Sequence, residues 1–171
     1  MTGKGHKVFG MAFAVVAAVP FYEYVGPVPT AMMIVASWFG STAPDWLEIR
    51  FRNRTLLRHR GITHVFILWA ALMAASLMML FGVLAEPFIY AGSALFGFSL
   101  GGISHWIGDV GTPMGVPVWH PKKRVTLRRW RGQTELVPIC IAWSSAIFIL
   151  TITLTIGDDV NLIMSLFNLA I

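Results

Sequence analysis

The stretch that decides the fold is residues 87–109, PFIYAGSALFGFSLGGISHWIGD. It stays apolar for about 20 residues, the length that a helix needs to cross the roughly 30 Å hydrocarbon core of a bilayer. Its repeated glycines are typical of membrane helices that pack closely against a neighbour. His105 and Asp109 are four residues apart, so a helix would place both on one face, as in metal-binding pairs. The stretch therefore predicts a membrane helix with a polar site at one end.

Four further apolar segments accompany this stretch: residues 8–21, 29–43, 65–85 and 136–156. The last two are long enough to cross a bilayer. The first two, at about 14 residues each, fit either short tilted spans or a helical hairpin that only partly crosses. Residues 160–171 are apolar but too short to cross, and we expect a short separate helix there. The sequence thus predicts an all-α, polytopic membrane protein, a single domain over residues 1–171 with about five membrane-embedded helices.

The amino-acid composition favours the same class. Apolar residues make up 56% of the chain and charged residues 12%, whereas a soluble domain usually has about 25% charged residues. The net charge of +5 could indicate nucleic-acid binding, but the basic residues adjoin apolar runs, which favours a membrane over nucleic acid. Cys140 is the only cysteine, which excludes a disulfide framework within the chain. The apolar run near the N-terminus lacks a convincing cleavage site, so we expect it to be retained as a membrane segment.

The distribution of charge predicts how the helices are oriented. All 13 Lys and Arg residues fall within residues 4–7, 50–60 and 122–131. The alternate connections carry only acidic residues: Glu23, Glu86, Asp158 and Asp159. Five crossings place the three basic segments on one side, and the positive-inside rule assigns that side to the cytoplasm. We therefore expect a multi-pass protein with a cytoplasmic N-terminus.

The residues that could carry chemistry gather on the same predicted side. They are His6, Asp45, Glu48, His59, His64, His105, Asp109 and His120. Ionisable side chains at the membrane edge are costly, and they are usually paired, bound to metal or in contact with water. Asp45 and Glu48 are three residues apart and share a helical face. His59 and His64 are five apart, so one continuous helix cannot aim both inward.

Each of these residues also has a plainer interpretation. A single interfacial histidine is more often a headgroup contact than a metal ligand, and His6 fits either role. The spacing of His105 and Asp109 in a glycine-rich span favours the metal role, which we also favour for His64 and Asp45. Glu48 could pair with a neighbouring arginine, Arg50 or Arg52. His120 lies beside Pro121 in a predicted loop and is expected to be structural.

Four blocks of the sequence resemble one known family. They are GHKVFG at residues 5–10, PDWLE at 44–48, RHRGITH at 58–64 and GGISHWIGDVGTPMGVPVWHP at 101–121. In this order they resemble the YdjM-like family of bacterial inner-membrane proteins, regarded as metal-dependent hydrolases, over roughly residues 3–130. The family is distantly similar to the zinc-dependent phospholipase C and P1 nuclease group of all-helical enzymes.

The resemblance implies a location in the bacterial inner membrane and a set of metal ligands. These would be His6, Asp45, His64, His105 and Asp109, with Asp109 a candidate bridge between two ions. Apart from the resemblance, His59 is a further candidate because it flanks Arg60. The chain departs from the family at PDWLE, because many relatives carry PDxDH. Leu47 therefore replaces an acid and Glu48 replaces a histidine.

The chemistry that fits these residues is hydrolysis of a phosphoester in a lipid or lipid-linked substrate at the membrane surface. One or two divalent ions, most plausibly zinc with His and carboxylate ligands, would supply hydroxide near neutral pH. Asp45 or Glu48 could accept the proton, and Arg58 and Arg60 could hold the phosphate. The alternative is a metal-stabilised membrane scaffold without catalysis, which binds anionic lipid or a protein partner. A transporter is disfavoured because two of the spans contain almost no polar residues.

Overall fold

The computed structural model describes residues 1–48, 50–51, 54–55, 60–81, 86–130 and 135–168. Within these ranges the chain is mostly helical. The helices are α1 (Gly3–Val25), α2 (Pro27–Gly40), α3 (Ala43–Trp46), the 3-10 turn η1 (Ile62–His64), α4 (Phe66–Phe81), α5 (Glu86–Val110) and α6 (Leu136–Asn168). Two short antiparallel ribbons complete it, β1 (Arg50–Phe51) with β2 (Arg54–Thr55), and β3 (Val116–Pro117) with β4 (Arg124–Val125).

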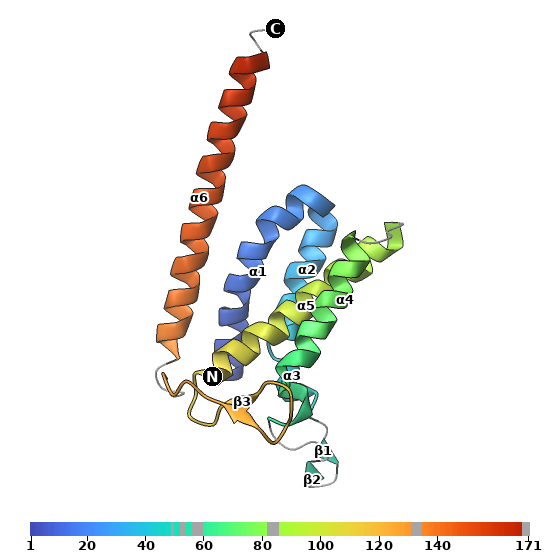
Figure 1. Cartoon of the computed structure of the whole chain (residues 1–171), viewed down its shortest axis with the longest axis vertical. Coiled ribbons are helices and arrows are strands. Elements are labelled where there is room, and N and C mark those ends of the chain that lie inside the picture. The colour runs from blue at the N-terminus through green and yellow to red at the C-terminus, as the bar shows by residue number, and fades with distance from the viewer. Residues whose placement is uncertain (49, 52–53, 56–59, 82–85, 131–134, 169–171) are drawn as a thin grey trace.

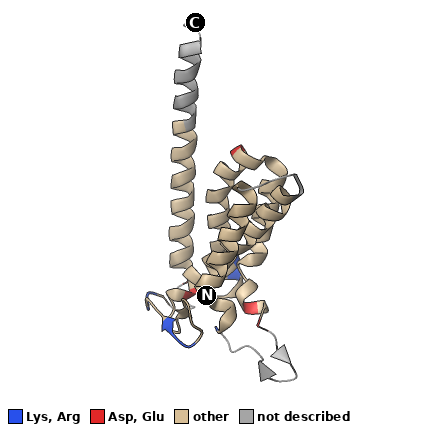
Figure 2. Ribbon diagram, turned by 45° about the vertical axis from the view of Figure 1, so that its right-hand side comes forward, with Lys and Arg blue, Asp and Glu red and all other residues tan. Residues whose placement is uncertain are grey.

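The helices run up and down around α5, which packs against α1, α2 and α4. The start of α1, together with α3, η1, β3 and β4, lies at one end of the bundle, and the turn between α1 and α2 lies at the other (Figure 1). We call the first end the basic end, because the described Lys and Arg residues gather there (Figure 2). Residues 111–130 fold back across it, where Trp106 Nε1 donates to Pro117 O at 2.9 Å and Ile67 N donates to Val118 O at 3.1 Å.

Glycines bring α2 and α5 into backbone contact, as the glycine pattern predicts. A Cβ on Gly97 would overlap the carbonyl of Met33, and one on Gly101 would overlap that of Ser37. Small residues allow this close approach between membrane helices. Residues at 97, 101, 105 and 109 lie on one helical face, so the same packing directs His105 and Asp109 into the bundle.

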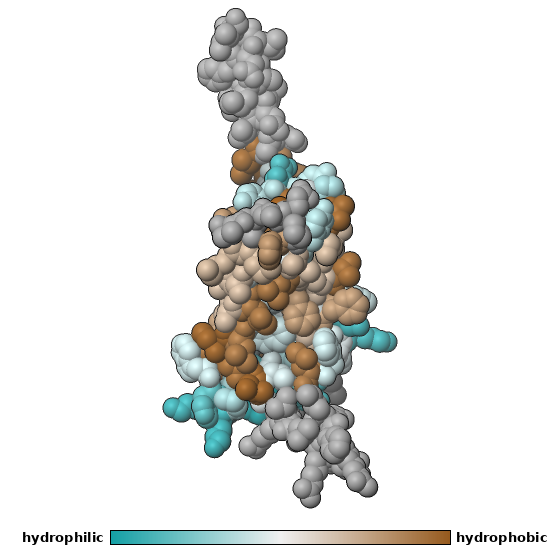
Figure 3. All heavy atoms as spheres, turned by 90° about the vertical axis from the view of Figure 1, so that its right-hand side faces the viewer, coloured by the Kyte–Doolittle hydropathy of each residue, from teal (hydrophilic) through white to brown (hydrophobic). Residues whose placement is uncertain are grey.

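Within the described part of the chain, two helices are long and apolar enough to span a membrane, Gly3–Val25 and Leu136–Ile156. The described helices α2 and α4 are shorter, with 14 and 16 residues. In Figure 3 apolar side chains cover the middle of one face, with hydrophilic side chains towards the two ends of the bundle. The chain is thus a helical protein with two candidate spans, while the five-span arrangement stays a prediction.

The C-terminal segment differs from the prediction. A separate short helix was expected over residues 160–171, but α6 continues without a break from Leu136 to Asn168. The prediction was wrong because the segment around Gly157 contains no proline, and one glycine costs a helix only about 1 kcal/mol.

Candidate metal centre

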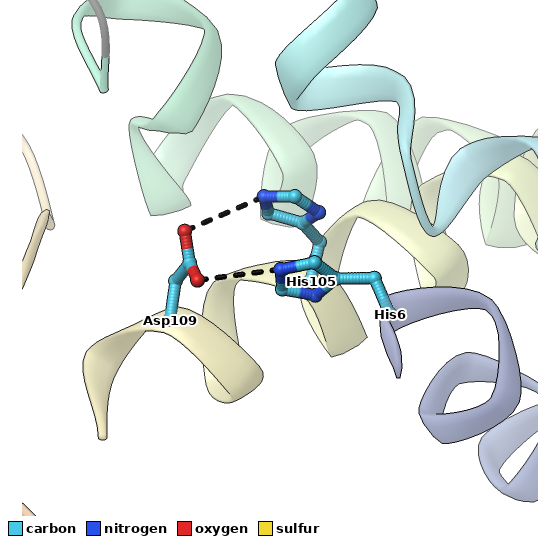
Figure 4. Close-up of side chains that lie close together, drawn as sticks. All are labelled: His6, His105 and Asp109. Atoms are coloured by element: carbon cyan, nitrogen blue, oxygen red, sulfur yellow. Dashed lines mark ion pairs between the residues drawn. The ribbon is translucent and has the colours of Figure 1, made fainter. Parts of the chain in front are cut away.

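The first half of the centre is built by α1 and α5. His6, in the second turn of α1, reaches the His105–Asp109 face of α5 (Figure 4). His6 Nε2 lies 3.3 Å from Asp109 Oδ1, and His105 Nε2 lies 3.5 Å from Asp109 Oδ2. The rings of His6 and His105 stack with centroids 3.7 Å apart. One nitrogen or oxygen of each residue lies within 4.8 Å of the others, so the three could hold a metal ion.

The second half shares Nε2 of His105 with the first. Asp45, on α3, and His64, at the end of η1, form with His105 another group whose ligand atoms lie within 4.8 Å. Asp45 Oδ1 is 3.4 Å from His64 Nε2 and 3.7 Å from His105 Nε2. Because both groups rely on Nε2 of His105, this histidine can serve only one ion at a time.

The hydrogen bonds of His105 determine which of its nitrogens is free to bind a metal. Its Nδ1 lies 2.8 Å from the carbonyl oxygen of Ser41. A carbonyl can only accept, so Nδ1 carries the proton, and in the neutral ring Nε2 keeps its lone pair. This backbone contact resembles the outer contacts that orient metal-binding histidines.

His64 is oriented in a similar way. Its Nδ1 lies 3.5 Å from Glu48 Oε1 and 3.1 Å from Thr63 Oγ1. With the proton on Nε2 the ring would donate to Asp45 Oδ1, 3.4 Å away. With the proton on Nδ1 towards the Glu48 carboxylate, the lone pair of Nε2 points inward instead. There it meets Nε2 of His105 at 3.3 Å. Two lone pairs at this distance repel unless a proton or a metal ion lies between them.

The pKa of His64 determines how many protons its ring carries at neutral pH. Burial lowers the pKa of His64 below its usual value, and this outweighs the opposing effect of Asp45. The ring is therefore neutral at pH 7 and carries one proton, on Nδ1 or on Nε2.

Asp45 is the accessible member of the centre. Its side chain is 42% exposed, whereas those of His64, His105 and Asp109 are 0–3% exposed. Burial alone would raise the pKa of Asp45. Its hydrogen bond to His64 and the nearby His105 together lower the pKa by more than burial raises it, so the net shift is downward. Asp45 is thus an ionised carboxylate that faces the outside of the site.

Arg60 holds the carboxylate of Asp109, the second aspartate of the centre. Its Nη2 lies 2.8 Å from Asp109 Oδ2, and its Nη1 donates to Thr112 Oγ1 at 2.8 Å and to Gly115 O at 3.2 Å. The amine of Met1 also lies 3.0 Å from Asp109 Oδ1.

The backbone of Arg60 is unusual as well. Its φ is 53°, in the left-handed region that side-chain-bearing residues rarely adopt. Its N–H donates to Glu48 Oε1 at 2.8 Å. The backbone contact and the guanidinium contacts together hold this conformation, which is typical of functional sites.

The structure brings five of the predicted ligands together: His6, Asp45, His64, His105 and Asp109. Their role in metal binding stays a prediction. Glu48 and Arg60 border them, whereas Arg58 and His59 lie outside the described residues. His120 lies apart in the turn between β3 and β4, where its Nδ1 accepts from Lys122 N at 3.3 Å.

Sequence reasoning missed Ser41 and Thr112. Ser41 acts through its backbone carbonyl, which leaves no residue-type signature. Thr112 follows Asp109 by three residues, and its hydroxyl could have been noted as a partner for a buried guanidinium.

One family of proteins matches almost the whole chain. The family described as YdjM inner membrane protein matches residues 1–170. The chain belongs to the YdjM inner membrane protein family. The match includes α6, in which no motif was found, and with the two candidate spans it makes this a membrane protein. No curated protein and no solved structure matches the chain, and the distant similarity to phospholipase C and P1 nuclease is not shown.

Proposed function

We propose that this YdjM family member is a membrane-embedded, metal-dependent hydrolase that cleaves a phosphoester of a lipid or lipid-linked substrate. The observation that carries the proposal is the pair of Nε2 atoms of His64 and His105, 3.3 Å apart. Each ring has its Nδ1 beside an acceptor, and two aspartates lie next to the pair. Such oriented imidazole pairs with carboxylates are typical of metal centres.

The residues present fit a divalent ion of the zinc type. Zinc is one of the metals that imidazole and carboxylate ligands suit. The buried Nδ1 of His6 has no hydrogen-bond partner among the described residues, and such unpaired buried atoms are uncommon outside functional sites. Either His6, His105 and Asp109 or Asp45, His64 and His105 would hold an ion, and a second ion would be held without His105, whose Nε2 offers one lone pair. When bound, such an ion supplies hydroxide near neutral pH and withdraws charge from a phosphoryl oxygen.

The side chains around the centre have distinct tasks in this proposal. Asp45 is ionised and exposed, so it would accept the proton of the attacking water as the new P–O bond forms and the bond to the leaving oxygen breaks. Glu48 would orient His64 rather than take the proton, because its Oε1 lies against His64 Nδ1 and Arg60 N. Arg60 would hold Asp109 in place and offer positive charge to the phosphate.

The finer topology belongs to the same proposal. We infer five crossings, with the basic end and the metal centre at the cytoplasmic face of the inner membrane. Support comes from the alternation of basic and acidic connections along the chain, which matches the positive-inside rule. A site at this depth favours substrates whose headgroup stays at the membrane surface.

A second candidate is a metal-stabilised scaffold without catalysis, which binds anionic lipid or a protein partner. The burial of His6, His64, His105 and Asp109 favours it, because structural metal sites are closed whereas catalytic ones keep an open position. The exposure of Asp45 favours the enzyme.

The deciding experiment uses the full chain purified in nanodiscs. Bound metal is measured by mass spectrometry, and phosphate release is measured with phosphatidic acid and with an isoprenyl monophosphate. The hydrolase proposal expects bound zinc and phosphate release that is lost with a chelator and restored by zinc. Bound zinc without phosphate release from either lipid supports the scaffold, and the absence of bound metal refutes both.

A further inference from the structure

An apolar cavity separates α6 from the rest of the bundle. It has a volume of about 620 Å³, and its residues come from α1, α5, α6 and the segment before α6. Ligand-binding cavities usually measure roughly 300–1,000 Å³. Phe13 and Val16 line it from α1, Leu100 and Ile107 from α5, and Ile141 from α6.

Specific contacts hold α6 against α1 near the basic end. Thr2 donates to the carboxylate of Glu135 from its backbone N at 2.6 Å and from its hydroxyl at 2.9 Å. Trp143 Nε1 donates to Val8 O at 3.0 Å. Several of the facing residues beyond these contacts are small, including Ala17, Ala142 and Ser145, so the helices stay together without filling the space between them.

The depth of the cavity identifies the chemistry of its occupant. α1 and α6 are the two candidate membrane spans, so the cavity lies among lipid tails. Its lining on α1 runs from Phe9 to Pro20, which corresponds to about 16 Å of helix at 1.5 Å per residue. This length is close to half of the roughly 30 Å hydrocarbon core, the depth of one leaflet.

The basic end of the cavity offers charge for a headgroup. Trp130 lines the cavity and donates from Nε1 to Gly108 O at 3.0 Å. Arg128 and Arg129 directly precede it and are exposed. An acyl chain in the cavity would therefore place its headgroup near two arginines, which are suited to phosphate oxygens.

We propose that this cavity binds one acyl chain of an anionic phospholipid, with the phosphate of the headgroup held by Arg128 and Arg129. The lipid would complete the contact between α6 and the α1–α5 pair. This site is separate from the metal centre, whose exposed member is Asp45, so the proposal does not depend on hydrolysis.

The test uses the full chain in phosphatidylcholine vesicles that contain phosphatidylglycerol with a photoreactive diazirine in its acyl chain. Adducts are located by mass spectrometry. Ser145→Phe and Ala17→Phe would each fill the cavity. Ser144→Phe is the matched control, because Ser144 is also exposed and neighbours Ser145 but does not line the cavity.

We expect adducts on cavity residues in the wild type and in Ser144→Phe. In Ser145→Phe and Ala17→Phe these adducts should fall about tenfold, which corresponds to about 1.4 kcal/mol of binding free energy. The double variant Arg128→Gln, Arg129→Gln should label equally with phosphatidylglycerol and phosphatidylcholine probes, whereas the wild type should prefer the anionic probe.

Adducts that cavity-filling variants leave unchanged would overturn the proposal. So would adducts between two copies of the chain in place of lipid adducts, because they would show that a second copy occupies the cavity. Lipid adducts with no preference for the anionic probe would refute the headgroup assignment.

Discussion

Replacing Asp109 by asparagine separates its role in stability from its role as a metal ligand. The Asp109 carboxylate lies 2.8 Å from the guanidinium of Arg60, and both side chains are buried. Asparagine keeps the volume but removes the charge, which leaves the guanidinium without its counter-ion. Breaking a buried pair costs about 3–5 kcal/mol. Arg60 would retain its hydrogen bonds to Thr112 and Gly115, so we expect the lower value.

The loss of unfolding free energy in Asp109→Asn can be measured in the absence of metal. For a chain of this size, 1 kcal/mol corresponds to roughly 2–4 °C in Tm, so a loss of about 3 kcal/mol predicts a fall of about 6–12 °C. The assay is thermal unfolding of the purified protein in detergent with a chelator. Zinc affinity, measured by competition with a coloured chelator, should fall by more than the about 10–100-fold typical of residues that only support a ligand.

The double variant Asp109→Asn, Arg60→Met distinguishes the two effects. Removing both partners of a buried pair is often close to neutral, so Tm should return to near the wild-type value while zinc affinity stays low. A single variant with wild-type Tm in chelator and wild-type zinc affinity would refute both the buried ion pair and the ligand assignment. A double variant that recovers zinc binding would refute the ligand assignment alone.

Three further predictions follow from the same geometry. Glu48→Gln should lower zinc affinity about 10–100-fold yet keep phosphate release at saturating zinc; release abolished with zinc still bound would instead make Glu48 the proton acceptor. Because burial lowers the pKa of His64 from 6.5, the unfolded chain binds the additional proton first, so the free energy of unfolding without metal should decrease as the pH falls below about 6.5. His64→Gln should make this decrease smaller, and an unchanged pH profile would contradict the assignment. In a Cys140→Ser background, an impermeant maleimide added to intact cells should label Glu23→Cys but not Lys122→Cys, and labelling at position 122 would reverse the orientation.

The parts of the fold that depend on local residue spacing could be predicted from the sequence. The close packing of α5 against a neighbour was predictable because Gly97 and Gly101 repeat at the helical period, but that the neighbour is α2 was not. The shared face of His105 and Asp109 was predictable for the same reason. The end of α6 was not, because a single glycine between apolar residues does not decide whether a helix continues.

The parts that depend on tertiary contacts could not be predicted. The spacing does not reveal that the carbonyl of Ser41 would fix the tautomer of His105, 64 residues away in sequence. Arg60 was expected to face a phosphate, yet its guanidinium lies against Asp109. An arginine beside histidines looks the same in sequence whether it binds a substrate or orients a carboxylate.

The charge balance of the centre is consistent with the proposed metal ion. Among the described residues, the carboxylates of Asp45, Glu48 and Asp109 lie within the network, against the single guanidinium of Arg60 and the amine of Met1. His64 adds no charge at neutral pH, because burial lowers its pKa. The cluster therefore carries an excess of negative charge at the edge of an apolar bundle, where uncompensated charge is costly. Three carboxylates against two cations leave an excess of one negative charge, and a cation bound between the Nε2 atoms of His64 and His105 would offset it.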